Sequence, residues 1–309
     1  MTPARLVALA LVPLVVACGA SSSATRSANL AIDPLAPSDL LPNDLDFVVR
    51  IDVRRLRNEP VFDDALNRLA NASGSGMMKW VLPVLEPSRA VFVGGRLMED
   101  GFHGDGVVAI ETSGVGGSEP LGVDPSFRHI AGTPKHVEIF ERTTDLRDEA
   151  ALEVVLAGGG IVLATAAEAD AVLRVARSGP DADRLDPPAR GLASFAGRVR
   201  PTAPAIMSAR AASTTPERGA AFLREIGRGL ARYTGSIEGG DALHIEAELF
   251  YTSADVAAEA AASIRSLVGR LGQSPGALQS LADSMKLGRD SEVVRLHATV
   301  SFAVLSYLH

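Results

Sequence analysis

The sequence contains a single cysteine, Cys18, and aromatic residues make up only 5% of it. Because a disulfide needs two thiols, no covalent cross-link within the chain can restrain the fold. Core packing must therefore carry the stability.

The sequence also lacks a basic stretch, and its formal net charge is −7. Proteins that bind nucleic acid present clustered Lys and Arg to the phosphates. We therefore expect no nucleic-acid partner. The acidic balance also argues against an added electrostatic attraction to anionic lipid.

No apolar run is long enough to cross a membrane. The run at the N-terminus, Leu6–Ala17, has about a dozen residues, whereas a membrane-spanning helix needs about 20. It follows a single basic residue, Arg5, and ends on small residues before Cys18. This layout is typical of a secretory signal peptide, which we place at residues 1–17.

The residues at the expected cut, Val15-Val16-Ala17-Cys18, resemble the lipobox of bacterial lipoproteins. In that family the thiol receives a diacylglyceryl group, the chain is cut before the cysteine, and the new amine is acylated. The resemblance implies that Cys18 is lipidated and that the chain reaches the membrane through this lipid. Asp after the cysteine retains Gram-negative members at the inner membrane, so Gly19 implies the outer membrane. The alternative is an ordinary signal cut near Ala20, which would discard Cys18.

The rest of the chain divides by composition into a tether and two folded units. Residues 18–40 are rich in small polar residues and contain two prolines, which favours a flexible tether. A polar, proline-rich stretch after residue 178 marks the middle of the folded body. We therefore expect one unit at 41–180 and another at 190–309.

Apolar periodicity predicts several elements of the first unit. Strands are expected at 46–53, with its odd-numbered residues facing inward, and at 89–97, 105–112, 136–142, 152–155 and 161–165. Asn58 is expected to cap a helix. Thr165-Ala166-Ala167-Glu168 has the form of a capping box that opens a second helix, which Gly179-Pro180 ends.

The second unit repeats this style. A strand is expected at 203–211, followed by a helix from Thr214 that includes Leu230. A strand at 243–251, with Leu243, Ile245 and Leu249 on one face, precedes a helix capped by Ser253. A helix from Ser274 to near Gly288, a strand at 294–300 and a short helix at 302–308 complete the chain. The fold class predicted is α+β, with two similar units of mixed or antiparallel sheet and helices packed on one face.

The start of the folded body, Leu41-Pro42-Asn43-Asp44, precedes a strand and then Asp52 and Leu56-Arg57. This order resembles a class of uncharacterised bacterial envelope proteins that open with the same pattern. The resemblance covers a small part of the chain and implies no known activity.

Catalytic and metal-binding motifs are missing. The sequence has no Gly-x-Ser-x-Gly, His-Glu-x-x-His, P-loop or dinucleotide fingerprint, so we assign no catalytic residue, metal ligand or cofactor. His244 and His297 lie on late strands and share a side with Glu246 and Glu248; we interpret them as solvent-facing polar residues, with a metal site as the alternative. Asp46, Arg50 and Asp52 are interpreted as an exposed ion cluster.

Two functions remain open on this basis. The first is a non-catalytic envelope lipoprotein whose body binds a protein, peptidoglycan or small envelope ligand and faces the periplasm or the cell surface. The second is a periplasmic hydrolase with an unrecognised site. A cleft that holds a buried carboxylate or histidine beside a convergent partner would favour the hydrolase.

Overall fold

The computed structural model describes residues 35–59, 88–96, 106–112, 126–130, 137–143, 150–157, 159–180, 182–199, 226–273 and 276–301. The described residues fall into two compact units, an N-terminal unit that ends at Leu185 and a C-terminal unit that begins at Asp186. The helices expected after Asn58 and at 302–308, and the strand expected at 203–211, lie outside the described residues.

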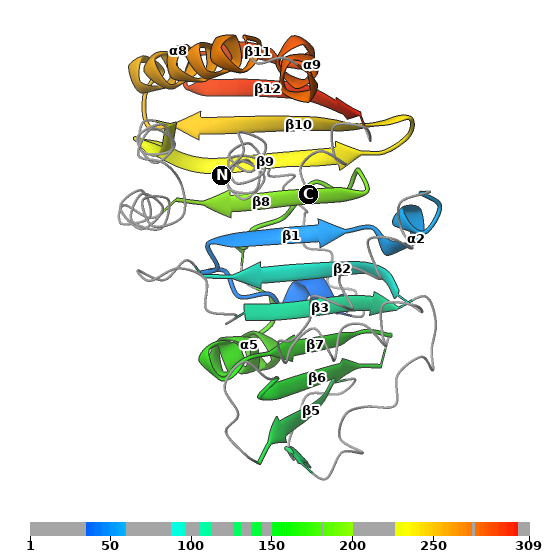
Figure 1. Ribbon diagram of the computed structural model, residues 1–309. Helices are drawn as coiled ribbons and strands as arrows, with labels where there is room; N and C mark the ends of the chain where they lie inside the picture. Colours follow the sequence, from blue (N-terminus) through cyan, green and yellow to red (C-terminus); the bar gives the residue numbers. More distant parts are fainter. Residues whose placement is uncertain are drawn as a thin grey trace, which may run out of the picture. The chain divides into compact units, whose positions relative to one another are not determined.

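The N-terminal unit is built on an antiparallel sheet (Figure 1). Its strand order is β1-β2-β3-β7-β6-β5-β4. The strands are β1 (Phe47–Ile51), β2 (Ser88–Gly95), β3 (Gly106–Thr112), β4 (Phe127–His129), β5 (Val137–Arg142), β6 (Leu152–Leu156) and β7 (Ile161–Ala164). The helical segments are η1 (Pro37–Leu40), α2 (Val53–Leu56) and α5 (Ala166–Ser178).

The core of this unit joins one face of the central strands to α2. Cross-strand partners such as Val91 and Ile110 on β2 and β3, and Ile110 and Ile161 on β3 and β7, bring aliphatic side chains into contact. Val53, the first residue of α2, packs into the same cluster. Burial of this apolar surface is the main force that holds the sheet together.

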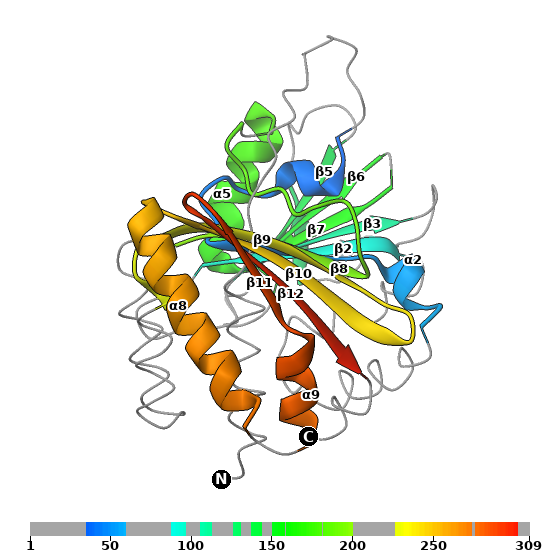
Figure 2. The same cartoon turned by 90° about the horizontal axis from the view of Figure 1, so that it is seen from above.

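The C-terminal unit is a second antiparallel sheet with the order β8-β9-β10-β12-β11. Its strands are β8 (Ala193–Arg198), β9 (Leu230–Glu238), β10 (Ala242–Tyr251), β11 (Lys286–Asp290) and β12 (Val293–Ser301). The helices α8 (Ala254–Leu271) and α9 (Ala277–Ser284) lie on one side of this sheet (Figure 2). Both helices contact β12.

The two sheets share an order of connection. In each, three strands that follow one another in the chain lie side by side in the sheet, and the third strand then pairs with the last strand of a later hairpin, β7 in one unit and β12 in the other. The expected α+β class is confirmed in its coarse form, and strands dominate the described residues. Every described pair within a unit is antiparallel, so the mixed sheet that was left open is not found there.

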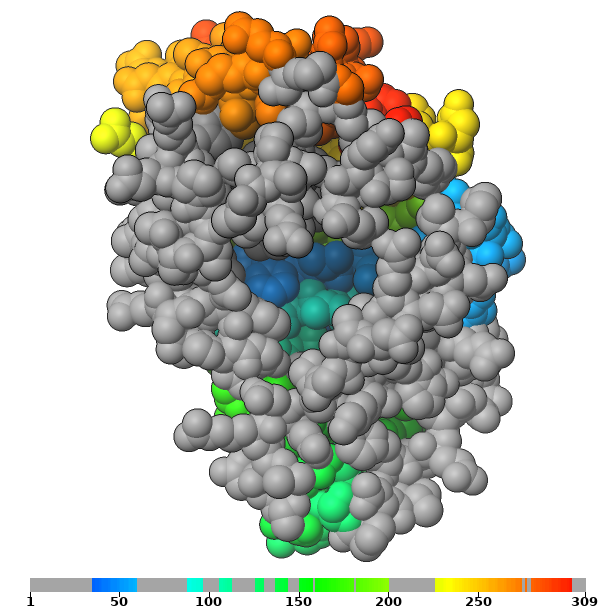
Figure 3. Space-filling model, viewed as in Figure 1, coloured from blue at the N-terminus to red at the C-terminus, as the bar shows by residue number. Residues whose placement is uncertain are grey.

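The first strand differs from the expected pattern. Val53 begins α2 instead of ending β1, because the carboxylate of Asp52 accepts a hydrogen bond from Arg55 N at 2.9 Å and caps the helix. Phe47 and Ile51, which were expected to be buried, are half-buried, whereas Val48 on the opposite face is fully buried. Atoms of β1, in blue, are visible at the surface in Figure 3.

The start of the folded body also differs from the expectation. Residues 37–40, assigned to the tether, form η1, and Leu40 is fully buried. Asp39 explains why this short turn forms, because its carboxylate accepts a hydrogen bond from Ala36 N at 2.9 Å and pairs with Arg184.

Strands β9 and β11 correct two predicted helices. Leu230 begins β9, so the helix expected to include it has ended before that residue. Gly288 lies within β11, because α9 ends at Ser284. The pairing of β8 with β9 places two rings over two glycines: Phe195 faces Gly235, and Tyr233 faces Gly197. A Cβ atom at either glycine would overlap the ring, and both rings are buried.

Candidate functional site

Helix α8 begins as the sequence predicts. The hydroxyl of Ser253 accepts a hydrogen bond from Val256 N at 3.3 Å, which satisfies one of the free amides of the first turn. The first four residues of its apolar stripe are buried against the sheet: Ala257, Ala260, Ala261 and Ile264. The last two, Val268 and Leu271, are only half-buried.

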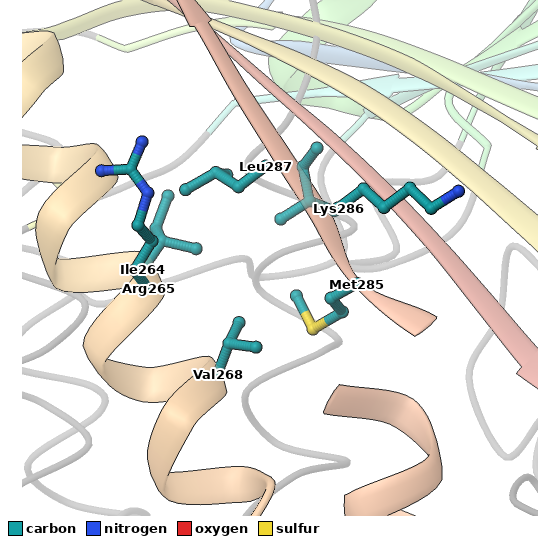
Figure 4. A pocket seen from close by; sticks show the side chains of 7 residues that line it. Ile264, Arg265, Val268, Met285, Lys286 and Leu287 are labelled. Carbon is teal, nitrogen blue, oxygen red and sulfur yellow. The ribbon is translucent and has the colours of Figure 1, made fainter. Parts of the chain in front are cut away.

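A hollow of about 220 Å³ lies beside the half-buried end of this stripe. It is lined by Ile264, Arg265, Val268, Met285, Lys286, Leu287 and Leu296. Figure 4 shows Ile264 and Val268 on α8 facing Met285, which lies between α9 and β11, and Leu287 on β11. Ile264 and Leu296 are buried, and the other apolar members are half-buried. As far as the described residues show, the hollow is therefore an apolar recess whose walls are only partly buried.

Two cations stand at this recess. Arg265 extends from α8 and Lys286 from β11, with their charged ends directed away from each other (Figure 4). Both side chains are exposed, and within the described part of the chain neither side chain makes a hydrogen bond or ion pair. Among the described residues, the lining contains no carboxylate, histidine or hydroxyl that could act as a general acid or base.

Sequence reasoning found one wall of this site and missed the other. The stripe on α8 was predicted, including Ile264 and Val268. Met285, Lys286 and Leu287 were assigned to a helix that was expected to reach Gly288. The sequence did offer one signal that a strand ends here, because Asp290 and Ser291 form a polar pair typical of a hairpin turn. In the structure Ser291 adopts a φ of 51° in this turn.

The polar residues of β10 and β12 are neighbours, as the sequence predicts. Glu246 stands opposite His297 in the register, and the rings of His244 and His297 lie 6.4 Å apart. Glu248 is engaged by Arg295, whose Nε donates to it at 2.9 Å. Within the described ranges no three His, Cys, Asp or Glu side chains lie close enough together to hold a metal ion. The third described histidine, His129, packs its ring against Phe140 on β5.

The ion cluster on β1 is not the exposed group that was expected. Asp46 is only 2% exposed, and the side chain of Arg50 is 12% exposed and donates to Asp52 at 3.0 Å. Glu111 on β3 interacts with the charges of Arg50 and Arg89. Burial raises the pKa of Glu111 above its ordinary value.

Replacing Glu111 with Gln is expected to stabilise the protein at neutral pH. A carboxyl whose pKa is raised by folding holds its proton more tightly in the native state. Its ionisation therefore destabilises the folded protein, and this loss of stability grows as pH rises through the unfolded pKa and is complete above the folded pKa. The gain in unfolding midpoint of Glu111→Gln over wild type should be present at pH 7 and vanish near pH 3. Thermal unfolding at both pH values measures it, and an equal gain at both would contradict the assigned cause.

A second ionic cluster is structural and joins three segments. Arg96 donates from Nε and Nη2 to the carboxylate of Glu168 at 2.5 and 3.0 Å, and from Nη1 to Asp44 at 2.7 Å. The hydrogen bond from Arg96 is the main reason that the pKa of Asp44 lies below its ordinary value. The same two partners raise the pKa of the Arg96 guanidinium.

This cluster corrects the predicted capping box. Thr165 is the N-cap of α5, but its hydroxyl bonds to Gly106 on β3 and makes no cap hydrogen bond. The carboxylate of Glu168 turns to Arg96 instead of back to the N-cap amide. Because Glu168 is nearly fully buried, the charged guanidinium is the stronger partner for it.

The predicted lipidation site, Cys18, and His103, His136 and His309 lie outside the described residues. Among the described helices, none combines the length and the apolar character that a bilayer crossing demands.

The fold and the recess define a protein with two sheet-based α+β units and an apolar site in the second. No protein-family model and no curated protein sequence matches the chain. Crystal form III of TP0453 is similar in structure, with a TM-score of 0.50 at 9% identity over 91% of this chain and 98% of that one. Crystal form I has a TM-score of 0.48 at 11% identity, covering 91% and 99% of the two chains. At these identities the likeness concerns the fold alone.

Proposed function

We propose that this protein is a non-catalytic lipoprotein of the cell envelope, anchored to the outer membrane through a lipid on Cys18. The observation that carries the proposal is the position of Cys18, directly after the apolar run and in a lipobox-like sequence. The residue after Cys18 is Gly19 and not the Asp that retains such lipoproteins at the inner membrane, which supports the outer membrane.

The anchor is physically sufficient without a spanning helix. Each buried methylene of an acyl chain contributes about 0.8 kcal/mol, so one chain anchors weakly and two or more anchor firmly. The diacylglyceryl group and the amide-linked chain that the lipobox implies would hold the two folded units at the membrane.

The folded body is proposed to bind an envelope protein or a small ligand. The recess beside α8 supports this role, because its described walls are apolar and include no acid–base pair. The partner is proposed to engage the C-terminal unit at this recess.

The hydrolase alternative has one observation in its favour. Glu111 is a partly buried carboxyl with a raised pKa near Arg50 and Arg89, which is the kind of group a general acid requires. Assays of the purified protein with chromogenic ester, peptide and glycoside substrates test this. Turnover that Glu111→Gln abolishes would establish the hydrolase and overturn the non-catalytic proposal.

Replacing Cys18 with Ser is expected to abolish lipidation and to leave an uncut precursor. Intact-mass measurement of the wild-type membrane form should show a lipid adduct on an N-terminal Cys18, and the Cys18→Ser chain should retain residues 1–17 without it. Ser21→Ala, a nearby change outside the lipobox, is the matched control and should keep the adduct. Detection of a wild-type chain that begins at Ala20 or later would refute the anchor.

A further inference from the structure

Strand β11 forms an open edge of the C-terminal sheet. It pairs with β12 on one side, and among the described residues no strand pairs with its other side. Four of its five residues are exposed, and Leu287 is half-buried. Helix α8 contacts β10 and β12 as well as β11, so it lies over a face of the sheet. Seen from above, neither α8 nor α9 crosses β11 (Figure 2). The edge of β11 is therefore accessible to another strand.

The backbone groups on this edge follow from the hairpin. A two-residue turn joins β11 to β12, and Asp290 stands opposite Val293 at its base. The pair that closes such a turn exchanges backbone hydrogen bonds, and bonded and non-bonded pairs then alternate along the two strands. The even-numbered residues of β11 therefore direct their N–H and C=O groups to β12. Leu287 and Arg289 direct theirs to the open edge.

The charges on β11 match a second copy of the same strand. When two copies run antiparallel with Gly288 opposite Gly288, Lys286 of each stands opposite Asp290 of the other. Leu287 and Arg289, the residues whose backbone groups face the edge, then stand opposite each other. Opposite charges on facing residues stabilise a pair of strands. A twofold axis forms each of these contacts twice.

Other alignments of the two copies lose this match. A pair centred on Arg289 places two guanidinium groups opposite each other, and like charges on facing residues are destabilising. A pair centred on Leu287 places Lys286 opposite Gly288, where it meets no carboxylate. A lysine on a sheet edge ordinarily discourages pairing with unrelated strands. Lys286 therefore favours a strand that brings a carboxylate to this position, as the second copy does.

The side of the pair that carries α8 is complementary as well. Nη1 of Arg289 donates a hydrogen bond to the carbonyl oxygen of Ala254, the first residue of α8, at 3.3 Å. The aliphatic stem of Arg289 is then placed beside Leu287 of the other copy. A long charged side chain covers apolar surface with its stem while its charge stays in water, so the half-buried Leu287 would lose contact with water.

We propose that β11 pairs with β11 of a second copy of this chain, so that two C-terminal sheets join into one continuous antiparallel sheet across a twofold axis at Gly288. Backbone hydrogen bonds between Leu287 and Arg289, and the ion pair of Lys286 with Asp290, hold the two copies together. This inference goes beyond the proposed function. It depends neither on the lipid on Cys18 nor on a ligand in the recess.

Cysteines placed on β11 test this alignment in the purified full-length protein in a non-ionic detergent. Gly288→Cys should give a disulfide-linked dimer on mild oxidation, because facing residues of a non-bonded pair have Cα atoms about 4.5 Å apart, within the reach of a disulfide. The strand accepts this change, since the nearest neighbour of a Cβ atom at Gly288 would be Cβ of Arg295 at 3.9 Å. Mass spectrometry of the linked peptides separates this dimer from any disulfide of Cys18.

Lys286→Cys is the matched control on the same face of the same strand. In the proposed alignment the two copies of residue 286 lie about 14 Å apart, four residues along the strand, so about tenfold less dimer is expected than from Gly288→Cys. A mixture of Lys286→Cys chains with Asp290→Cys chains should form the dimer again, because these two positions face each other.

Charge reversal tests the choice of partner. Lys286→Asp, added to Gly288→Cys, places two carboxylates opposite each other and should reduce the dimer about tenfold. Adding Asp290→Lys restores the match with the signs exchanged and should recover the dimer. Thermal unfolding of each variant verifies that it is folded.

Three results would overturn the proposal. Equal dimer from Gly288→Cys and Lys286→Cys would mean that the disulfides report random collisions. No dimer from folded Gly288→Cys would mean that the edge stays unpaired or receives a strand of another protein. Charge reversal without effect would mean that Lys286 and Asp290 do not select the partner. None of these measurements uses the lipid, so their failure is distinguishable from a failure of the anchor in the Cys18→Ser experiment.

Discussion

Replacing Arg96 with Met is expected to lower the free energy of unfolding by about 3–5 kcal/mol, the usual cost of breaking a buried ion pair. The change leaves the carboxylate of Glu168, which is 1% exposed, without its bidentate partner. It also removes the ion pair between Asp44 and Arg96, the residue that follows β2. Urea unfolding monitored by circular dichroism measures the loss.

Two further variants isolate the cause. Arg128→Met removes an arginine of the exposed pair with Glu141 and should cost less than about 1 kcal/mol. Adding Glu168→Leu to Arg96→Met should recover part of the loss, because the unpaired buried charge is then gone. A double variant that is less stable than Arg96→Met alone would contradict this explanation.

Replacing Ile264 with Ala is expected to cost about 2–5 kcal/mol, as large-to-small changes in a core do. Ile264 is 3% exposed and is the last fully buried position of the α8 stripe. Since the chain has no disulfide to restrain the unfolded state, the loss should appear directly as a lower unfolding midpoint.

Leu271→Ala is the matched control for this change. Leu271 lies on the same stripe but is half-buried, so its truncation should cost clearly less. An Ile264→Ala protein with unchanged stability would show that this part of α8 does not pack on the sheet.

The sequence predicted best where a strand has one covered face. On β12 the buried residues alternate without exception over Val294, Leu296, Ala298 and Val300, and the period of two is read directly from the residues. On β10 the same alternation holds for Leu249, whereas Ile245 is half-buried and Glu248 is less exposed than Glu246. The helix after Ser253 was predicted for the same reason, since its apolar residues recur with the helical period.

Strand β9 shows why periodicity failed elsewhere. Thr234 and Ser236 are polar yet buried, and Gly235 stands where the apolar face would continue. The ring of Phe195, on strand β8, covers Gly235. The local sequence of β9 therefore does not indicate that this position is buried. The prediction of exposure was wrong for Asp46 and Arg50 for a related reason: charged side chains are ordinarily exposed, and the local sequence does not show that these two are covered.

For the candidate site, the sequence indicated the α8 stripe but not the recess. The recess requires β11 to be a strand, and only Leu287 in that segment is apolar and half-buried. Its formation depends on pairing with β12, in which Leu287 stands opposite Leu296. That tertiary pairing is invisible to a local pattern.

The two rings that pack over glycines fix the register of β8 against β9. No short turn connects β8 to β9, so loop length cannot set how the two strands line up. A shift by two residues would keep every side chain on its own face but would drive Phe195 against Tyr233 or Ile237 in place of Gly235. The same shift would remove Gly197 from beneath Tyr233. One ring belongs to β8 and the other to β9, so a single misalignment breaks both contacts. Only one register of the two strands therefore preserves them.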